Sequence, residues 1–260
     1  MQKMYYNGQM VNVHEDINFL FPVYEVIRVV DGNIHFLDEH LRRLERSWNL
    51  SDKLRRKEYI GYDRLAEICR KVVEENELND QNIRIDIDGI STVVKPVESF
   101  YPSSKEYETG VDTITTGYTR SNPNAKIHNV LLRERVRQIQ SIENVFEVLL
   151  VDEAGQILEG SKSNVFFMKG NTIHTAPIEN VLGGVTREVV LQIVHDMPEL
   201  RLYLKPVNVK DIFKFDCCFL TGTSIDLLPI RRIDSQTYHS ASNQYFKQLL
   251  EIFRDVAASG

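Results

Sequence analysis

Three separated stretches of the sequence carry side chains that could act together in one reaction. Lys126 lies in the run Asn-Pro-Asn-Ala-Lys-Ile-His-Asn, and Glu159 begins the run Glu-Gly-Ser-Lys-Ser-Asn. A lysine amine can attack an aldehyde once burial or nearby positive charge lowers its pKa. The segment 183–187, Gly-Gly-Val-Thr-Arg, could open a helix whose free N–H groups and dipole favour an anion.

Each of these residues also has an ordinary explanation. A single lysine is most often a solvated surface group, Glu159 could face water at a hairpin turn, and Thr186 could simply cap the helix. An amine, a carboxylate and an anion site are, however, the set that pyridoxal phosphate requires. The three stretches therefore suggest the hypothesis that Lys126 holds this cofactor as a Schiff base, that Glu159 pairs with its pyridine nitrogen, and that the glycine turn binds its phosphate. These residues alone leave that hypothesis undecided against the ordinary explanations.

Composition excludes several other classes of protein. The 260 residues are 42% hydrophobic and 26% charged, which is ordinary for a globular protein and allows one large domain or two smaller ones. The net charge of −6 argues against a nucleic-acid-binding protein. Three irregularly spaced cysteines predict neither a disulfide framework nor a metal site, and therefore a reducing cytoplasm. With no apolar run of about 20 residues and no apolar signal-peptide core, we expect no membrane association.

The pattern of apolar residues predicts an α+β fold. Hairpins are expected at 4–13 and 23–37, followed by a helix that Asp38 could cap and whose apolar face comprises Leu37, Leu41, Leu44 and Trp48. A second amphipathic helix is marked by Leu65, Ile68, Cys69, Val72 and Val73. An alternating, half-buried strand is expected at 83–88. Residues 94–107 could be a loop, an irregular edge strand or both. Turn residues at 119–124 predict a linker between an N-terminal domain, 1–118, and a C-terminal domain, 125–260. Further helices are predicted at 130–141, 186–197 and 243–256, hairpins at 146–158 and 164–175, and a strand at 216–220.

Taken together and in this order, these segments resemble the fold-type IV pyridoxal-phosphate enzymes, the class IV aminotransferase family. The family includes branched-chain aminotransferases, D-amino-acid aminotransferases and aminodeoxychorismate lyases. The most specific pieces are Glu-Gly-Ser-Lys-Ser-Asn-Val-Phe-Phe from Glu159 and Gly-Val-Thr-Arg from Gly184. Val-Tyr-Glu-Val-Ile-Arg at 23–28, His-Leu-Arg-Arg-Leu at 40–44 and the Lys-x-x-Asn pattern from Lys126 support them, so the resemblance covers nearly the whole chain.

The resemblance implies a small N-terminal α/β domain, a larger β-rich pseudobarrel domain, a site between them and a homodimer. It implies that Lys126 is the Schiff-base lysine and proton shuttle, and that Glu159 contacts the pyridine nitrogen. Tyr24 and Glu25 would lie on the substrate side. The remaining cofactor-binding residues that it implies, most of them around the phosphate, are Arg43, Asn164, Val185, Thr186, Thr223 and Ser224.

Departures from the family pattern concentrate on the substrate side. Phe21-Pro22 stands where a glycine normally precedes the Tyr-Glu motif, and Leu-Gly-Gly-Val-Thr-Arg replaces Leu-Pro-Gly-Ile-Thr-Arg. After the strand at 83–88 there is no arginine and histidine pair of the kind that D-amino-acid aminotransferases use to hold the α-carboxylate. The cofactor side therefore looks intact, whereas the substrate side looks altered.

Three functions follow from this interpretation. The first is an aminotransferase that moves an amino group between a small amino acid and a 2-oxo acid, which Glu25 favours slightly. The second is an aminodeoxychorismate lyase that forms 4-aminobenzoate and pyruvate, which the short chain and the run Ser-Lys-Ser-Asn-Val-Phe-Phe would suit. The third is a cofactor-binding homologue without turnover, which Phe21-Pro22 and the missing carboxylate clamp would explain.

Overall fold

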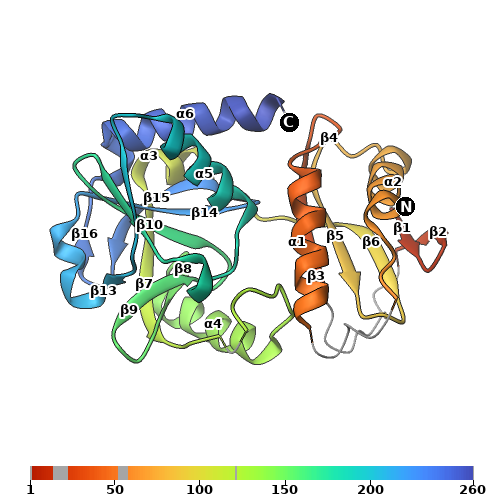
Figure 1. The fold of residues 1–260 in the computed structure, drawn as a ribbon, viewed down its shortest axis with the longest axis horizontal. Coiled ribbons are helices and arrows are strands. Elements are labelled where there is room, and N and C mark those ends of the chain that lie inside the picture. The colour runs from red at the N-terminus through yellow and green to blue at the C-terminus, as the bar shows by residue number, and fades with distance from the viewer. Residues whose placement is uncertain (1, 14–22, 52–57, 121, 260) are drawn as a thin grey trace. The chain divides into compact units, whose positions relative to one another are not determined.

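Strand pairing divides the chain into two units, seen in a computed structural model that describes residues 2–13, 23–51, 58–120 and 122–259 (Figure 1). Unit 1 comprises Met1–Phe100, Ala125–Asn129 and Gly260, and unit 2 comprises Tyr101–Asn124 and Val130–Ser259. The division differs from the predicted domains 1–118 and 125–260. Strand β7 (Val111–Gly117) pairs with β8 and β15 in the sheet of unit 2, while Ile127 forms a bridge with Val23 in unit 1.

Unit 1 contains a six-stranded antiparallel sheet with the strand order β2-β1-β6-β5-β3-β4. Both predicted hairpins are confirmed, and their turns place Asn7-Gly8 and Asp31-Gly32 at positive φ, which these residue types tolerate. The elements of this unit are β1 (Lys3–Tyr6), β2 (Gln9–Asn12), β3 (Val23–Val30), β4 (Asn33–Ile34), α1 (Leu37–Leu50), α2 (Tyr62–Glu75), β5 (Asp80–Ile87) and β6 (Thr92–Val97).

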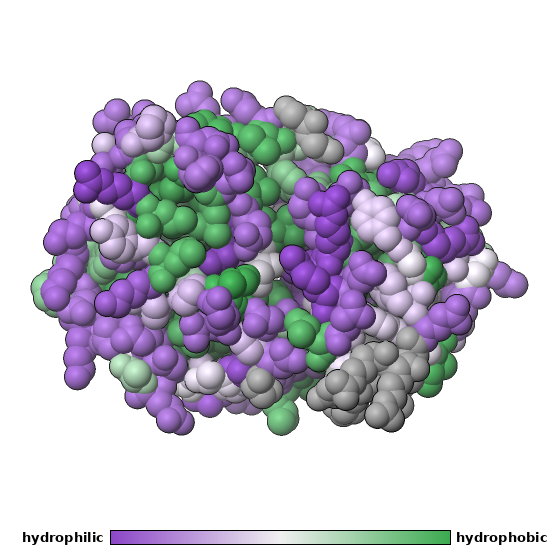
Figure 2. Space-filling view, viewed as in Figure 1, coloured by the Kyte–Doolittle hydropathy of each residue, from purple (hydrophilic) through white to green (hydrophobic). Residues whose placement is uncertain are grey.

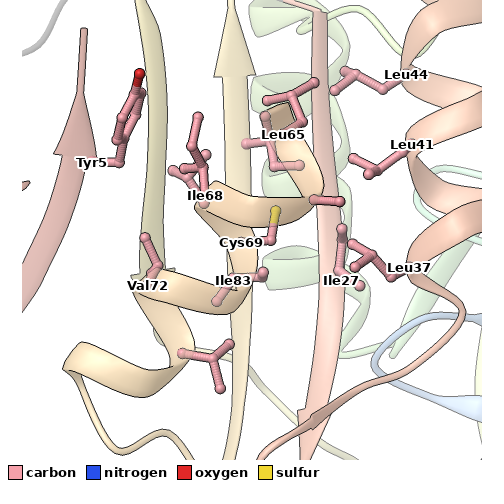
Figure 3. Packing of buried hydrophobic residues seen from close by; sticks show 14 of the residues in the cluster. Tyr5, Ile27, Leu37, Leu41, Leu44, Leu65, Ile68, Cys69, Val72 and Ile83 are labelled. Atoms are coloured by element: carbon pink, nitrogen blue, oxygen red, sulfur yellow. The ribbon is translucent and has the colours of Figure 1, made fainter. Parts of the chain in front are cut away.

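Helix α1 is amphipathic and supplies much of the core of unit 1. Figure 3 shows Leu37, Leu41 and Leu44 directed toward strand β3, which carries Ile27, and all four side chains are buried. The predicted apolar face of this helix is therefore confirmed. Charged residues lie on the opposite face, and Figure 2 shows mostly hydrophilic side chains where α1 meets the solvent. Helix α2 adds the predicted residues Leu65, Ile68, Cys69, Val72 and Val73 to the same cluster.

Three local predictions in this region are wrong, the third of them in part. Asp38 does not cap α1, because it lies inside the first turn, where it accepts a hydrogen bond from the Tyr62 hydroxyl, and Phe36 occupies the N-cap without a side-chain bond. Strand β5 is buried on both faces over much of its length rather than half-buried. In the segment 94–107, residues 94–97 belong to β6, which is an internal strand between β1 and β5 and not an edge, whereas residues 98–103 form a loop as one alternative expected.

Unit 2 contains a ten-stranded mixed sheet, which curls on itself in Figure 1. Its strand order is β12-β11-β10-β14-β15-β7-β8-β9-β13, with β16 paired to β15. Besides β7, the strands are β8 (Glu147–Val151), β9 (Gln156–Gly160), β10 (Asn164–Lys169), β11 (Thr172–Thr175), β12 (Arg201–Leu204), β13 (Val207–Asn208), β14 (Cys217–Gly222), β15 (Asp226–Ile233) and β16 (Gln236–Thr237). The α+β class is confirmed, as are both predicted hairpins of this unit.

The longer helices of unit 2 agree with the sequence pattern to within a few residues at their ends. The helices are α3 (Ser104–Thr109), α4 (Val130–Glu143), α5 (Val185–Asp196) and α6 (Gln244–Ser259), with short 3-10 helices at Ile178–Asn180, Val209–Lys214 and Ser240–Ser242. Helix α3 lies outside the predicted helices, although Ser103 and Glu106 form the capping box that starts it. Among the described residues, no helix is both long enough and apolar enough to cross a membrane.

Candidate functional site

The backbone around Lys126 is attached to unit 1 on two sides. The Tyr24 amide of β3 donates to the Lys126 carbonyl at 3.1 Å, and the Lys126 amide donates to Ser47 Oγ of α1 at 3.1 Å. The bridge between Val23 and Ile127 extends the contact with β3. These contacts fix the backbone from which the lysine side chain projects.

The side chain of Tyr24 brings together the charged groups near Lys126. The amine Nζ of Lys126 lies 5.1 Å from the centroid of the Tyr24 ring, and the Arg84 guanidinium carbon lies 4.5 Å from the same centroid. His128 meets this ring edge-on at 6.1 Å between centroids. Tyr24 and Lys126, predicted separately from sequence, therefore belong to one cluster, and Arg84 is a member that the prediction did not include.

Glu25 lies on the other face of the same strand, because consecutive strand residues point to opposite sides. Its carboxylate accepts hydrogen bonds from Arg43 Nε at 2.7 Å and Arg43 Nη2 at 2.6 Å, and lies 2.9 Å from His40 Nδ1. Burial alone would raise the pKa of Glu25, but the Arg43 charge and the bonds from Arg43 and His40 hold it well below its usual range. Burial lowers the pKa of His40.

This arrangement bears on two sequence predictions. Arg43 is buried and ion-paired, so it is not an exposed helix arginine. Tyr24 and Glu25, which the resemblance groups together on the substrate side, face opposite sides of the sheet. Glu25 therefore forms its ion pair with Arg43 on the face of the sheet that Tyr24 does not share.

Glu159 of β9 is buried in unit 2 and is held by three donors. Arg120 Nε donates at 2.7 Å, the Leu182 amide at 3.0 Å and Asn164 Nδ2 at 3.5 Å. The second nitrogen of Arg120 donates to the Ser161 carbonyl at 2.7 Å. The alternative that Glu159 faces water at a hairpin turn is therefore wrong, since the side chain is only 4% exposed. Asn164, predicted to bind the cofactor, is a neighbour of Glu159.

A second buried carboxylate, Glu147 of β8, organises the loop that follows Glu159. It accepts hydrogen bonds from the hydroxyls of Ser161 and Ser163 at 2.6 and 2.9 Å. The amides of Val148, Ser161 and Lys162 donate to it as well. Glu147 and Arg120 were not among the predicted site residues. No sequence signal identifies them, because the hydroxyls and carboxylate that they bond are 14 to 39 positions away along the chain.

The glycine turn at the start of α5 is confirmed as a helix N-terminus. Gly184 is the N-cap, and a Cβ atom there would lie 2.1 Å from Asn164 Oδ1, so any other residue would require the Asn164 side chain to move. Val185 and Thr186 form the first helical turn, whose amides have no partner within the helix. The alternative that Thr186 is the N-cap is therefore wrong.

Thr223 and Ser224 lie in the loop between β14 and β15, two and three residues after the buried hydroxyl of Thr221. Thr221 pairs with Asn164 in the register of β10 and β14, and its buried Oγ1 has no hydrogen-bond partner among the described residues. A buried hydroxyl without a partner is costly. The loop that carries Thr223 thus begins beside Asn164 and next to a group that is able to bond a ligand.

The residues of unit 2 fit a cofactor with a ring nitrogen and a phosphate. Glu159 is a fixed, buried carboxylate, which suits a protonated ring nitrogen, and the first turn of α5 suits an anion. The hydroxyls of Thr221, Thr223 and Ser224 follow on the neighbouring strand and loop. Lys126, Tyr24, Glu25 and Arg43 belong to unit 1 and the other predicted residues to unit 2.

Comparisons with known proteins agree with this chemistry. The family model described as amino-transferase class IV matches residues 22–233. A D-alanine aminotransferase of Bacillus licheniformis is 28% identical over 92% of this chain and 91% of its own. An aminodeoxychorismate lyase of Bacillus subtilis is 24% identical over 96% of this chain and 93% of its own.

The fold is also similar to that of solved branched-chain aminotransferase structures. The crystal structure of the branched-chain amino acid aminotransferase of Escherichia coli superposes with a TM-score of 0.86 at 22% identity, covering 98% of this chain and 94% of that one. A further branched-chain aminotransferase structure, solved with pyridoxamine 5'-phosphate, gives a TM-score of 0.87. Because the family model spans most of the chain and the two-domain fold is shared, the protein belongs to the class IV aminotransferase family.

Proposed function

We propose that this protein is a pyridoxal-phosphate-dependent aminotransferase that moves an amino group between a small amino acid and a 2-oxo acid. The observation that carries the proposal is the fixed position of Lys126, whose amine lies 5.1 Å from the Tyr24 ring in a chain of this family. Such an amine is the nucleophile that an aldehyde cofactor needs. We also propose a homodimer in the cytoplasm, as the family resemblance implies.

The predicted residues divide into those that hold the cofactor and those that act on the substrate. Glu159 would pair with the pyridine nitrogen, with Asn164 and Arg120 fixing its carboxylate. The phosphate would bind at the first turn of α5, at Val185 and Thr186, and the other predicted contacts are Thr223 and Ser224 of the β14–β15 loop and Arg43 of α1. When bound, the cofactor supplies an aldehyde for the amine and a ring that accepts an electron pair.

Lys126 performs the proton transfer in this proposal. Its Nζ would take the proton from the substrate Cα, hold it and later return it, as a positioned general base and acid does. Tyr24 lies against this amine and limits where it can move. In this proposal Glu25 acts by holding Arg43, since both oxygens of its carboxylate bond to that guanidinium, and its place on the substrate side stays a prediction of the resemblance.

The test is the visible absorption band that a lysine-bound pyridoxal phosphate gives. The wild-type protein and a Lys205→Ala control, which removes an exposed lysine, should both show the band when the cofactor is added. Lys126→Ala should not. Amino acids of both configurations are then added to the wild type, and loss of the band identifies a donor. An equal band in Lys126→Ala would overturn the assignment.

A lyase is the second candidate function. The run Ser-Lys-Ser-Asn-Val-Phe-Phe from Ser161 and the similarity to the Bacillus subtilis lyase favour it. The same lysine and cofactor would serve, with elimination in place of amino transfer. Incubation with aminodeoxychorismate separates the two functions, because only a lyase forms 4-aminobenzoate above the background without enzyme.

A homologue without turnover is the third candidate. Two sequence features suggest this candidate. Phe21-Pro22 lies outside the described residues, and the absence of the arginine and histidine pair is observed in the sequence alone. Such a protein would bind the cofactor and show the visible band, yet no amino acid would remove it. Loss of the band with a single amino acid would exclude this candidate.

A further inference from the structure

Arg84 and Asp86 form a closed ion pair on one face of β5. The guanidinium donates from Nε and from Nη2 to the two carboxylate oxygens of Asp86, both at 2.6 Å. The side chains are only 18% and 4% exposed, so the pair is largely removed from water. Burial alone would lower the pKa of Arg84, but the hydrogen bond and charge of Asp86 raise it, so the guanidinium stays charged.

The pair and the proposed catalytic amine share one neighbour, the ring of Tyr24. The Arg84 guanidinium carbon is 4.5 Å and Lys126 Nζ is 5.1 Å from the centroid of the same Tyr24 ring. Lys95 is the register partner of Arg84 on β6, which places another cation on this face of the sheet. Asp86 is itself the register partner of Tyr24 on β3.

Without Asp86, this face would attract a carboxylate. A guanidinium presents a planar fork that binds a carboxylate through two hydrogen bonds, and such charge-assisted pairs are about twice as strong as neutral ones. Asp86 already occupies the Nε and Nη2 edge of Arg84 and cancels its charge. A substrate carboxylate that approached Arg84 would therefore also meet the negative charge of Asp86.

We propose that Asp86 determines the substrate class of this site: by closing Arg84, it makes the enzyme favour amino acids with an uncharged side chain over dicarboxylic ones. The proposal rests on the proposed aminotransferase function. Asp86 is a specificity-determining residue here and takes no part in proton transfer.

Asp88 offers a matched control at the end of the same strand. It is also a buried carboxylate, two residues from Asp86, but its Oδ1 accepts from the amides of Ile90 and Ser91 instead of from Arg84. Asp88→Asn therefore removes a nearby carboxylate charge without releasing the guanidinium.

The experiment compares glutamate with glutamine as amino donors, because the two differ in side-chain charge and hardly in shape. Asp86→Asn should raise the ratio of kcat/KM for glutamate to that for glutamine about 10- to 100-fold. Asp88→Asn should leave the ratio at the wild-type value, and Arg84→Gln/Asp86→Asn should return it there. An unchanged ratio in Asp86→Asn, with activity and the cofactor band retained, would overturn the proposal.

A second measurement does not depend on turnover. Titration calorimetry of each variant with glutarate, an unreactive dicarboxylate, should show tighter binding to Asp86→Asn than to the wild type or Asp88→Asn by a similar factor. Equal binding to all three proteins would contradict the role of Asp86. If the wild type forms no cofactor band or converts no amino acid, the proposed function fails on its own, and the glutarate titration still decides whether Asp86 closes Arg84.

Discussion

Two buried carboxylates, one in each unit, are stabilised in opposite ways. Glu25 in unit 1 depends on one cation, since Arg43 donates to both of its oxygens and His40 adds one further contact. Glu147 in unit 2 accepts five hydrogen bonds, all from neutral donors among the described residues. The first carboxylate is neutralised by one ion pair, whereas the second is solvated by a loop that wraps around it.

The two buried carboxylates should respond differently to the loss of one partner. A buried ion pair fails as a whole when one partner is lost, because the remaining charge has no compensation. A carboxylate with several neutral donors loses only a fraction of its stabilisation with any one of them. The Glu25–Arg43 pair of unit 1 should therefore be sensitive to single substitutions, and the Glu147 loop next to Glu159 should tolerate them.

The largest expected effect tests the ion pair of unit 1. Glu25→Leu leaves the Arg43 charge buried without its carboxylate, so we expect a loss of about 3–5 kcal/mol in the free energy of unfolding. Glu25→Leu/Arg43→Met removes both charges and should recover much of this loss. Urea unfolding without added cofactor measures both values.

An exposed pair from the same sheet is the control for this experiment. Arg28 and Asp80 are 3.3 Å apart, and the Asp80 side chain is 63% exposed. Asp80→Ala should cost less than about 1 kcal/mol because solvent screens the pair. If Glu25→Leu were as mild as Asp80→Ala, the ion pair would not be the main stabilising contact of Glu25.

A smaller effect should appear in the pH dependence of stability. Burial lowers the pKa of His40 below its ordinary value of 6.5, against the opposing influence of Glu25 and with smaller contributions from Arg43 and Lys126. As the pH falls below 6.5, the unfolded chain therefore binds a proton at His40 that the folded chain does not. Folding stability must then fall, by at most about 1.4 kcal/mol per pH unit for one proton.

His40→Gln isolates this contribution from those of other titrating groups. The variant should lose less stability than the wild type as the pH is lowered from neutral to about one unit below the ordinary histidine pKa, as followed by urea unfolding at each pH. If the two proteins lost stability in parallel, His40 would titrate in the folded state as it does in the unfolded state.

Local structure is accessible from sequence because it rests on short-range patterns. The turns at Asn7-Gly8 and Asp31-Gly32, the apolar face of α1 and the N-terminus of α5 at Gly184 each follow from adjacent residues. The proposed roles of Lys126 and Glu159 come from the resemblance to one family, because residue chemistry alone leaves those roles undecided.

The parts that sequence does not reveal depend on contacts between distant residues. Strand β6 has the composition of a loop or an irregular edge, because its pairing with both β1 and β5 cannot be inferred from its own residues. Arg120 lies in the predicted linker, yet it bonds Glu159, which is 39 positions away. The contact between Arg84 and Tyr24 also cannot be inferred from the sequence, because the pairing register of β3 and β5 brings these two distant residues together.

The smallest expected effect tests the neutral network of unit 2. Ser163 Oγ is one of five donors to Glu147, at 2.9 Å, so Ser163→Ala should cost only about 1 kcal/mol of unfolding free energy. Glu147→Leu is the contrasting variant, because it leaves all of these donors without their acceptor and should cost considerably more. Urea unfolding of both variants decides between a shared network and a single essential bond. A loss in Ser163→Ala as large as that in Glu147→Leu would mean that one hydroxyl holds the loop, and that the two units do not differ in the way their buried carboxylates are stabilised.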